Sequence, residues 1–369
     1  MKIAFVISTF SAGGAERVAS LLCNQWVAAG HDVHLCLFQG KDIELFYPVD
    51  EKIHLHQLDV MSVASNKINM AKQFLNRVLS LKETLEEIKP DIVFSFLTET
   101  NVAAILAARM AHTPIIVSER VHPQYHKVGS LKNLARKLSY NFADQVTVQS
   151  EDIKAWFSQK LKLETKIIPN PIASVTSFSR KTVLSERKKL VAMGRLEKQK
   201  GFDHLISTFI SLQNEFPDWD LKIYGTGSLR DDFQRKINEA HISDRITLEG
   251  VTTQVNDVFA HADVFVHTAQ YEGFPNVIVE ALANGCCVVA TKSPGALRDI
   301  LNDGKFGILC EHQELENALS KTMSNPNLRV EMRAKAQEAV KRYDLALVAD
   351  MWLEEASKVI EKSKEKNKS

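Results

Sequence analysis

Residues 166–190 read KIIPNPIASVTSFSRKTVLSERKKL, and this stretch decides how the chain is divided. Its two prolines and its polar, serine-rich composition interrupt an otherwise regular pattern. On both sides of it, short runs rich in β-branched residues alternate with segments of helical length and roughly 3.6-residue periodicity. The sequence therefore predicts two α/β domains joined by a linker near residues 170–186.

Runs with the composition of strands occur on both sides of this stretch. Several are apolar on successive residues, as parallel strands covered on both faces are. The pattern predicts two doubly wound, Rossmann-like domains, 1–170 and 171–345, and a C-terminal helix in 346–369 that crosses back to the first domain. The last residues, EKSKEKNKS, have too few apolar side chains to pack and are expected to be disordered. The predicted strands are KIAFVIS, HDVHLCLF, IHLHQL, PDIVFSF, PIIVSE and QVTVQS, then LVAMGRL, LKIYGTG, RITLEG, DVFVHTA, CCVVAT and GILC.

The overall composition limits the function classes. With 46 basic and 45 acidic residues the net charge is +1, so no global field attracts nucleic acid. Five cysteines without a C-x-x-C pair favour reduced thiols in the cytoplasm over a disulfide scaffold. No apolar run approaches the roughly 20 residues that cross a bilayer.

Loops that follow strands are where doubly wound folds bind ligands. Gly13 and Gly14 follow the first strand and precede a helix, whose N-terminal amides attract anions; a tight turn without a ligand is the alternative. Arg195 and Lys200 follow the first strand of the second domain and suit a diphosphate, or else are two solvated cations.

The segment IYGTGSLRDDF contains Gly225 and Gly227 before a helix. Arg230 stands where G-x-G-x-x-G has its third glycine, so the segment favours a mononucleotide loop over an NAD site.

Two glutamates lie in YEGFPNVIVEALANG, residues 271–285. The pattern predicts a helix that starts near Pro275, with Glu272 on the loop before it and Glu280 about one and a half turns inside it. Both carboxylates could accept hydrogen bonds from ribose or hexose hydroxyls in a crevice between the domains. The alternative is that Glu272 stabilises the helix dipole and Glu280 is an exposed acid.

Taken in order, GGAER, GRLEKQKG, GTGSLR and EGFPNVIVEALANG resemble the retaining GT-B glycosyltransferases of glycosyltransferase family 4. The resemblance covers nearly the whole chain, and EGFPNVIVE matches the family's E-x(7)-E signature. SFLTETN (95–101) and VSERVHP (117–123) are similar to bacterial members that extend polyprenyl-diphosphate-linked glycans or cell-surface polysaccharides. The resemblance implies metal-independent, cofactor-free transfer of a hexose or N-acetylhexosamine from a UDP-sugar to such an acceptor, forming an α-glycosidic bond.

The resemblance also implies roles for individual residues. Arg195 and Lys200 would neutralise the donor diphosphate as catalytic groups. Glu272, also catalytic, would contact the transferred sugar, and Glu280 would hold the ribose. The rest of the donor pocket is assigned to Gly14, Gly225, Gly227, Gly273, Phe274, Pro275 and Asn276.

On the acceptor side the resemblance implies Gly13, Glu119, Arg120 and His122. Related enzymes often have a histidine where this chain has Arg120, and His122 follows two residues later. Either Arg120 contacts a phosphate and His122 lies near the acceptor hydroxyl as a catalytic group, or neither reaches the site and His122 is a surface residue.

Two basic amphipathic segments of the first domain, 120–143 and 66–90, favour contact with an anionic membrane or a lipid diphosphate. The protein would then be peripheral on the cytoplasmic face of the inner membrane. Ordinary surface helices with their apolar faces on the sheet are the alternative. The cations of these segments are Arg120, Lys127, Lys132, Arg136 and Lys137, and Lys67, Lys72, Arg77 and Lys82.

Two other classes would use the same crevice. A UDP-sugar 2-epimerase-like enzyme and a non-catalytic nucleotide-sugar-binding protein both remain open at this point, although a binding protein would have little use for both glutamates and both phosphate cations.

Overall fold

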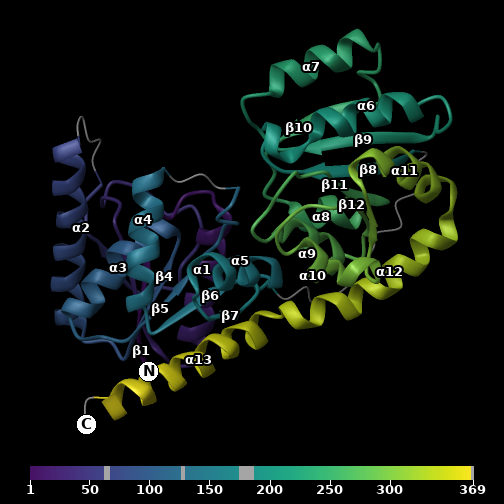
Figure 1. Cartoon of the computed structure of the whole chain (residues 1–369). Coiled ribbons are helices and arrows are strands. Elements are labelled where there is room, and N and C mark those ends of the chain that lie inside the picture. The colour runs from purple at the N-terminus through teal and green to yellow at the C-terminus, as the bar shows by residue number, and fades with distance from the viewer. Residues whose placement is uncertain (62–66, 126–128, 174–186, 367–369) are drawn as a thin grey trace. The chain divides into compact units, whose positions relative to one another are not determined.

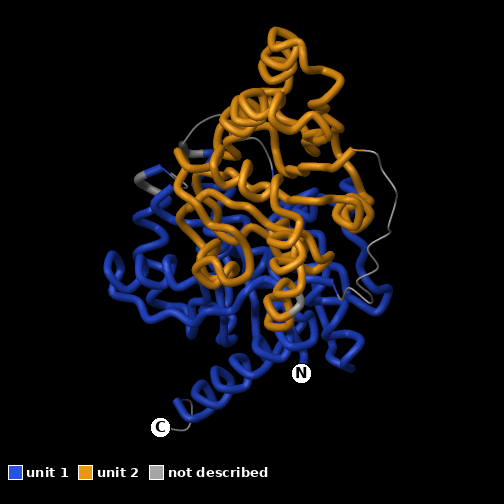
Figure 2. Tube along the Cα trace, turned by 90° about the vertical axis from the view of Figure 1, so that its right-hand side faces the viewer, with its two compact units in different colours: residues 1–173, 343–369 blue, residues 174–342 orange. Residues whose placement is uncertain are grey.

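The computed structural model describes residues 1–61, 67–125, 129–173 and 187–366 (Figure 1). The chain forms two compact units, with Met1–Ala173 and Tyr343–Ser369 in unit 1 and Ser174–Arg342 in unit 2 (Figure 2). These boundaries differ by a few residues from those expected at 170 and 345. Residues 174–186 of the expected linker lie outside the described residues.

The described residues of unit 1 form a parallel sheet of seven strands in the order β3-β2-β1-β4-β5-β6-β7. Six of these strands match predicted runs. The seventh, β7, was not predicted, because it is a three-residue edge strand and two of its residues lie in the stretch 166–190 that interrupts the pattern. The strands are β1 Lys2–Ile7, β2 Asp32–Leu37, β3 His54–Gln57, β4 Ile92–Phe96, β5 Ile115–Ser118, β6 Gln145–Val148 and β7 Thr165–Ile167.

Helices cover both faces of this sheet. Alternate residues of its strands are therefore buried in two core clusters on opposite sides. Side chains of α1 and α13 share one core cluster with Phe5 of β1. Side chains of α2, α3 and α5 share another with Val6. The helices are α1 Gly14–Ala28, α2 Lys67–Ile88, α3 Thr98–Met110, α4 Ser130–Ser139, α5 Glu151–Leu161 and α13 Leu345–Lys366.

The C-terminal helix α13 is built into the core of unit 1. Trp26 Nε1 of α1 donates a hydrogen bond to Ala349 O at 3.3 Å. The Trp352 ring lies 5.3 Å from that of Phe94. The helix continues to Lys366, so the expectation of disorder is wrong for residues 361–366. Their glutamates and lysines have high helix propensity, and lysines in the last turn complement the helix dipole.

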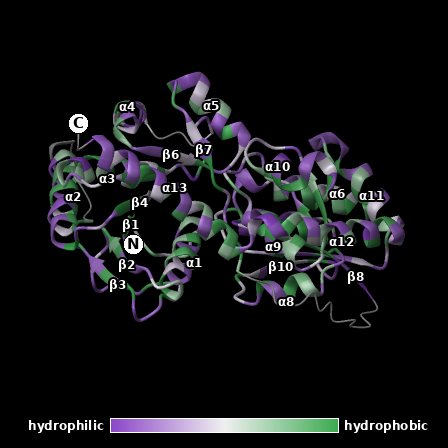
Figure 3. Cartoon of the chain, turned by 90° about the horizontal axis from the view of Figure 1, so that it is seen from below, coloured by the Kyte–Doolittle hydropathy of each residue, from purple (hydrophilic) through white to green (hydrophobic). Residues whose placement is uncertain are grey.

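Unit 2 repeats the first six positions of this topology. Its described strands form a parallel sheet in the order β10-β9-β8-β11-β12-β13, and all six match predicted runs. Figure 3 shows hydrophobic and hydrophilic residues along the same helices, as expected where one face of a helix packs on a sheet. The strands are β8 Lys188–Met193, β9 Trp219–Tyr224, β10 Ile246–Gly250, β11 Val264–His267, β12 Cys287–Thr291 and β13 Ile308–Cys310. The α-helices are α6 Phe202–Leu212, α7 Arg230–Glu239, α8 Val255–Ala260, α9 Asn276–Ala283, α10 Leu297–Leu301, α11 Leu315–Ser324 and α12 Pro326–Val340.

In each sheet the strand order reverses beside the first strand, between β1 and β4 and between β8 and β11. Doubly wound sheets bind ligands at the carboxyl ends of the strands around such a point. The loops after these four strands therefore define the places where each unit can hold a ligand.

Candidate functional site

In unit 2, the loops after β8 and β11 are joined by hydrogen bonds. Gln270 N donates to Gln199 O at 2.8 Å, and Gln199 Nε2 donates to Tyr271 O at 2.8 Å. Thr268 Oγ1 donates to Lys200 O at 2.8 Å. The two loops thus hold each other in place at the point where the strand order reverses.

Lys200 and Glu272 form an ion pair between these loops. Their side chains are only 15% and 14% exposed, so solvent screens the pair weakly. From the sequence we expect separate partners for the two residues, a diphosphate for Lys200 and a sugar for Glu272. The structure brings them into direct contact, so each charge is within reach of whatever the other binds.

Three glycines let the backbones of neighbouring loops approach closely. Gly201 has a left-handed φ of 68°, and a Cβ there would lie 2.2 Å from Thr268 O. A Cβ at Gly225 would lie 1.9 Å from Gly194 O, and one at Gly227 would overlap the same loop. The segment predicted to be a mononucleotide loop therefore packs its glycines against the loop after β8.

Arg230, which replaces the third glycine of the dinucleotide pattern, is the first residue of α7. Its Nη2 donates to Leu248 O at 3.0 Å and so ties the start of the helix to β10. Arg195 lies exposed on the loop after β8. Beside it, the Glu197 carboxylate accepts hydrogen bonds from Ser228 N at 3.1 Å and Oγ at 3.0 Å, which lower its pKa. These contacts fix the loop that carries Arg195.

The loop of residues 268–275 is also fixed against the loop after β12. Glu272 N donates to Pro294 O at 3.2 Å, and Ala296 N donates to Gly273 O at 3.1 Å. Gly295 makes this approach possible, because its φ is 110° and a Cβ there would lie 1.8 Å from Glu272 O. The backbone beside the Glu272 side chain is thereby held from two directions.

Helix α9 begins at Asn276, with Pro275 as its N-cap residue, one position later than the sequence indicated. Phe274 is buried, and Gly285 has the positive φ of 69° expected after a helix end. Glu280 is buried inside α9, which packs against α12 and β12. The alternative that Glu280 is an exposed acid is therefore wrong.

His267, at the end of β11, was not singled out in the sequence. Burial and the nearby positive charge of Lys200 lower its pKa to about 3, so the imidazole is neutral. Its Nε2 makes no hydrogen bond within the described part of the chain. The only signal in the sequence was a histidine in the last position of an apolar strand.

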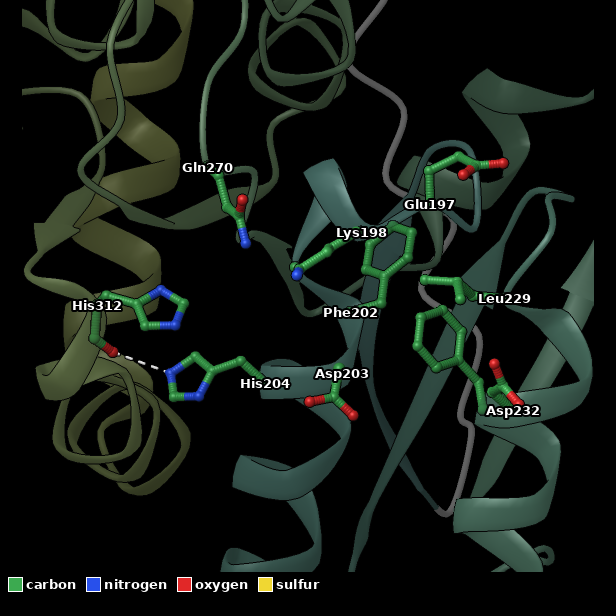
Figure 4. Close-up of a pocket in the computed structure, with 11 residues that line it drawn as sticks. Glu197, Lys198, Phe202, Asp203, His204, Leu229, Asp232, Gln270 and His312 are labelled. Carbon is green, nitrogen blue, oxygen red and sulfur yellow. Dashed lines mark hydrogen bonds between the residues drawn. The ribbon is translucent and has the colours of Figure 1, made fainter. Parts of the chain in front are cut away.

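A pocket of about 380 Å³ opens beside the loop after β8, at the start of α6. Figure 4 shows His204 and His312 side by side at one end of it; their ring centroids are 3.9 Å apart, and His204 Nε2 lies 2.9 Å from His312 O. Lys198 and Gln270 also line the pocket, whereas Arg195 and Lys200 do not.

In unit 1, Gly13 is the N-cap residue of α1 and Gly14 is its exposed first residue. The Glu16 side chain folds back over this turn and lies so close to Gly13 that a Cβ there would be 2.1 Å from Glu16 Oε2. Thr9 Oγ1 donates to Glu16 Oε1 at 3.3 Å. A carboxylate of the chain itself therefore lies at the helix end where the sequence predicted an anion.

Glu119 is fully buried at the end of β5. Its carboxylate accepts hydrogen bonds from Thr98 Oγ1 at 2.8 Å, Tyr140 OH at 3.1 Å and Arg136 Nη1 at 3.5 Å. Burial raises the pKa of Glu119, although Arg136 opposes this shift. Glu119 thus joins β5, α3 and α4 in the interior of unit 1.

Arg120 is also buried, and its guanidinium lies 3.9 Å from the centroid of the Phe96 ring. Nη1 donates to Ser118 Oγ at 3.3 Å, whereas Nε and Nη2 donate no hydrogen bond within the described residues. Burial lowers its pKa to about 9. Two unpaired donors on a buried cation are costly, and they suit an anionic ligand.

His122 is buried, so the alternative that it is a surface residue is wrong. Its Nε2 lies 3.2 Å from Asp152 Oδ2, and its ring centroid lies 4.9 Å from that of Tyr125. Burial lowers the pKa of His122, although Asp152 opposes the shift. Whether His122 reaches an acceptor hydroxyl stays a prediction.

Helix α4, in the predicted basic amphipathic segment 120–143, exposes two of its leucines and buries one of its cations. In α4 the apolar side chains Leu134 and Leu138 are 51% and 59% exposed, so they do not pack on the sheet. Arg136 of the same helix is buried against Glu119, and Lys132 pairs with Glu99. Within the described residues, no helix is both long and apolar enough to span a membrane. Lys127 lies outside the described residues, as do the side chains of Lys67 and Leu131.

Two known families match consecutive parts of the chain. Residues 12–174 match Glycosyltransferase Family 4, and residues 175–339 match Glycosyl transferases group 1. The boundary between the matches lies one residue after the boundary between the two units at Ala173 and Ser174.

Two bacterial glycosyltransferases are similar to this chain over nearly their whole length. The Campylobacter jejuni protein named GalNAc-alpha-(1->4)-GalNAc-alpha-(1->3)-diNAcBac-PP-undecaprenol alpha-1,4-N-acetyl-D-galactosaminyltransferase is 26% identical over 96% of this chain and 97% of that protein. The amylovoran biosynthesis glycosyltransferase AmsD of Erwinia amylovora is 22% identical over 93% of this chain and 95% of that protein.

Solved structures share the fold. The sucrose-phosphate synthase of Thermosynechococcus elongatus superposes with a TM-score of 0.82 at 17% identity, over 97% of this chain and 98% of that one. Anabaena HepE in complex with UDP and glucose has a TM-score of 0.77 at 20% identity, over 97% and 99% of the two chains. Because the family matches follow each other along most of the chain, the protein belongs to the GT-B glycosyltransferases, with a family 4 N-terminal domain and a group 1 C-terminal domain.

Proposed function

We propose that the protein transfers a hexose or N-acetylhexosamine from a UDP-sugar to a lipid-linked or polysaccharide acceptor, with retention of the α configuration. The observation that carries this proposal is the Lys200–Glu272 ion pair at the reversal point of unit 2, with Arg195 exposed on the same loop as Lys200. Cations suit a diphosphate, and an adjacent carboxylate suits sugar hydroxyls.

The chemistry depends on where negative charge develops. As the bond between the sugar C1 and the diphosphate oxygen breaks, charge builds on the leaving diphosphate. Arg195 and Lys200 stabilise it more in the transition state than in the bound donor, and this difference lowers the barrier. Because two side chains supply this positive charge, we propose that transfer needs no metal ion.

The ion pair adds a role for Glu272 to this scheme. Before the donor binds, Glu272 holds the Lys200 ammonium between the two loops. When the diphosphate arrives, Lys200 can bind it with one of its three donors, and a Glu272 oxygen remains for a hydroxyl of the moving sugar. Glu280, buried in α9, is the proposed partner of the ribose hydroxyls.

For the acceptor, the support comes from unit 1 and from the relatives. Arg120 has two buried donors that an acceptor phosphate would satisfy. The Campylobacter relative is named for an undecaprenol-diphosphate-linked substrate and the Erwinia relative for amylovoran biosynthesis. We therefore favour a polyprenyl-diphosphate-linked glycan or a cell-surface polysaccharide as the acceptor class.

The exposed side chains Leu134, Leu138 and Phe142 support peripheral contact of unit 1 with the cytoplasmic face of an anionic membrane. Flotation with anionic liposomes at low salt should recover the wild type but less of the Leu138→Glu variant. The Leu347→Glu variant, changed at an exposed leucine of α13 outside both basic segments, is the matched control. Absence of wild-type binding would contradict this part of the proposal.

A panel of UDP- and GDP-sugars, each with and without a lipid-diphosphate acceptor, tests the activity. We expect acceptor-dependent release of UDP and an α-linked product by NMR, with no gain in rate when Mg²⁺ or Mn²⁺ is added to the chelator-treated enzyme. A changed donor sugar without acceptor would instead indicate an epimerase, and donor binding without turnover would indicate a binding protein.

A further inference from the structure

A group of histidines and an aspartate lies at the other end of the unit 1 sheet, where β2 and β3 begin. Asp32 and His34 occupy alternate positions of β2, so their side chains project from the same face. The parallel register places His54 of the edge strand β3 beside His34. Three side chains that commonly bind metals therefore meet on one face of two neighbouring strands.

The distances between their polar atoms match a compact coordination site. Asp32 Oδ1 lies 3.2 Å from His34 Nε2 and 3.5 Å from His54 Nε2. One such atom from each of the three residues lies within 4.8 Å of the others. In a tetrahedral zinc site with bonds of about 2.0 to 2.2 Å, ligand atoms are roughly 3.3 Å apart. Only small side-chain movements would be needed.

A fourth residue holds the central histidine. His56 Nε2 lies 3.0 Å from His34 Nδ1, so the second ring nitrogen of His34 is engaged while Nε2 faces Asp32. Metal-binding histidines almost always donate their second ring N–H to an acceptor, most often a carboxylate, a backbone carbonyl or water, and His56 Nε2 takes that place here.

An ion can reach this group from solvent, because the His54 side chain is 61% exposed whereas that of His34 is 12% exposed. Lys2 Nζ lies 3.8 Å from the other carboxylate oxygen, Asp32 Oδ2, and leaves Oδ1 to the histidines. Two imidazoles and one carboxylate favour zinc and similar divalent transition ions over magnesium or calcium, which prefer oxygen ligands.

We propose that Asp32, His34 and His54 bind one divalent ion of the zinc type, with water as a further ligand. The ion would join the four-residue edge strand β3 to β2. It would lie at the amino ends of the strands, away from the loops at their carboxyl ends, and so would stabilise unit 1 without taking part in sugar transfer. In the sequence, these residues appear as D-x-H in β2 and H-x-H in β3. The two patterns are about 20 residues apart, and only the pairing of the strands brings them together.

The test uses the untagged full-length protein after treatment with a chelator, titrated with Co²⁺. We expect one equivalent to bind, with the visible absorption of four-coordinate cobalt, and Zn²⁺ to displace it. The His54→Ala and Asp32→Asn variants should each bind Co²⁺ at least ~10-fold more weakly. The His112→Asn variant, changed at an exposed histidine of the same unit, should bind like the wild type.

Thermal unfolding gives an independent readout. Zn²⁺ at 100 times its wild-type Kd should stabilise the wild type by several degrees and the His54→Ala variant by about half as much or less. Equal cobalt affinity in the wild type and both ligand variants would overturn the proposal, as would a wild-type protein that binds no cobalt. Loss of sugar transfer would not bear on it, because the proposed ion has no role in that reaction.

Discussion

Unit 1 and unit 2 share a strand order through their first six strands, yet they place their charged side chains differently. In unit 2, Arg195, Lys200 and Glu272 lie on loops at the carboxyl ends of β8 and β11, partly or fully exposed. In unit 1, Glu119 and Arg120 lie at the corresponding end of β5 but are buried.

This difference indicates two uses of the same topology. Charges on loops can exchange partners when a ligand binds, because water and neighbouring side chains satisfy them in its absence. Buried charges must be satisfied inside the fold or remain costly, so they define a fixed framework. We therefore expect substitutions of the loop charges in unit 2 to change turnover, and substitutions of the buried charges in unit 1 to change stability or acceptor binding.

The largest effect should come from the loop cations of unit 2. Arg195→Ala or Lys200→Ala should lower turnover by ~10²-fold or more, because each removes a charge that stabilises the leaving diphosphate. Steady-state kinetics with saturating acceptor measures this. Lys198→Ala, an exposed lysine of the same loop, should remain within about two-fold of the wild type. Near-wild-type rates in both active-site variants would contradict the donor assignment.

The next effect concerns the pH dependence of stability in unit 2. His267 has a folded pKa of about 3, below its ordinary value of 6.5, so it binds protons more readily in the unfolded chain. Its contribution is complete above about pH 6.5 and is lost as pH falls towards 3. At pH 5 the loss should be about 2 kcal/mol relative to pH 7, and His267→Gln should lack it. Urea denaturation at a series of pH values measures the free energy of unfolding of the wild type and of His267→Gln. The same dependence on pH in both proteins would contradict this prediction.

A smaller effect tests whether Lys200 and Glu272 act as a unit. In a double-mutant cycle of Lys200→Ala and Glu272→Gln, we expect a coupling free energy of about 1 to 2 kcal/mol in kcat/KM, because each substitution removes the partner of the other. The matched pair Lys198→Ala and Glu272→Gln should be additive. Additivity in the first pair would mean that the ion pair has no part in catalysis.

The smallest effect is expected from Arg120 in unit 1. Arg120→Leu removes a buried cation with two unpaired donors, so the free energy of unfolding should stay the same or rise by about 1 kcal/mol. The KM for a diphosphate-linked acceptor should rise several-fold, while the KM for the donor stays unchanged. A destabilised variant with normal acceptor KM would show that Arg120 serves the framework alone.

Most of the fold could be predicted because its signals are local. Twelve of the strands appear as β-rich runs, and YEGFPNVIVEALANG predicts its helix to within one residue. β7 was missed because three residues carry too little periodicity. The helical residues 361–366 were missed because their composition was read as too polar to pack, whereas α13 is already anchored to unit 1 by Trp352.

The candidate site could be predicted only as a set of loops. Sequence spacing places Lys200 and Glu272 after strands, but their contact depends on β8 and β11 being neighbours. The burial of Glu280 and His122 depends on helices and loops that pack over them. A sequence pattern does not report what covers a side chain.

The two α/β domains, the charged loops and the resemblance to a glycosyltransferase family can all be predicted from the amino-acid sequence, because periodicity and motifs are properties of short segments. Three features depend on the folded chain. Lys200 pairs with Glu272, 72 positions away, Arg120 is buried with two donors that have no partner among the described residues, and Asp32, His34 and His54 share one face. Such contacts depend on the order of strands in each sheet, which the local pattern of apolar and polar residues does not encode.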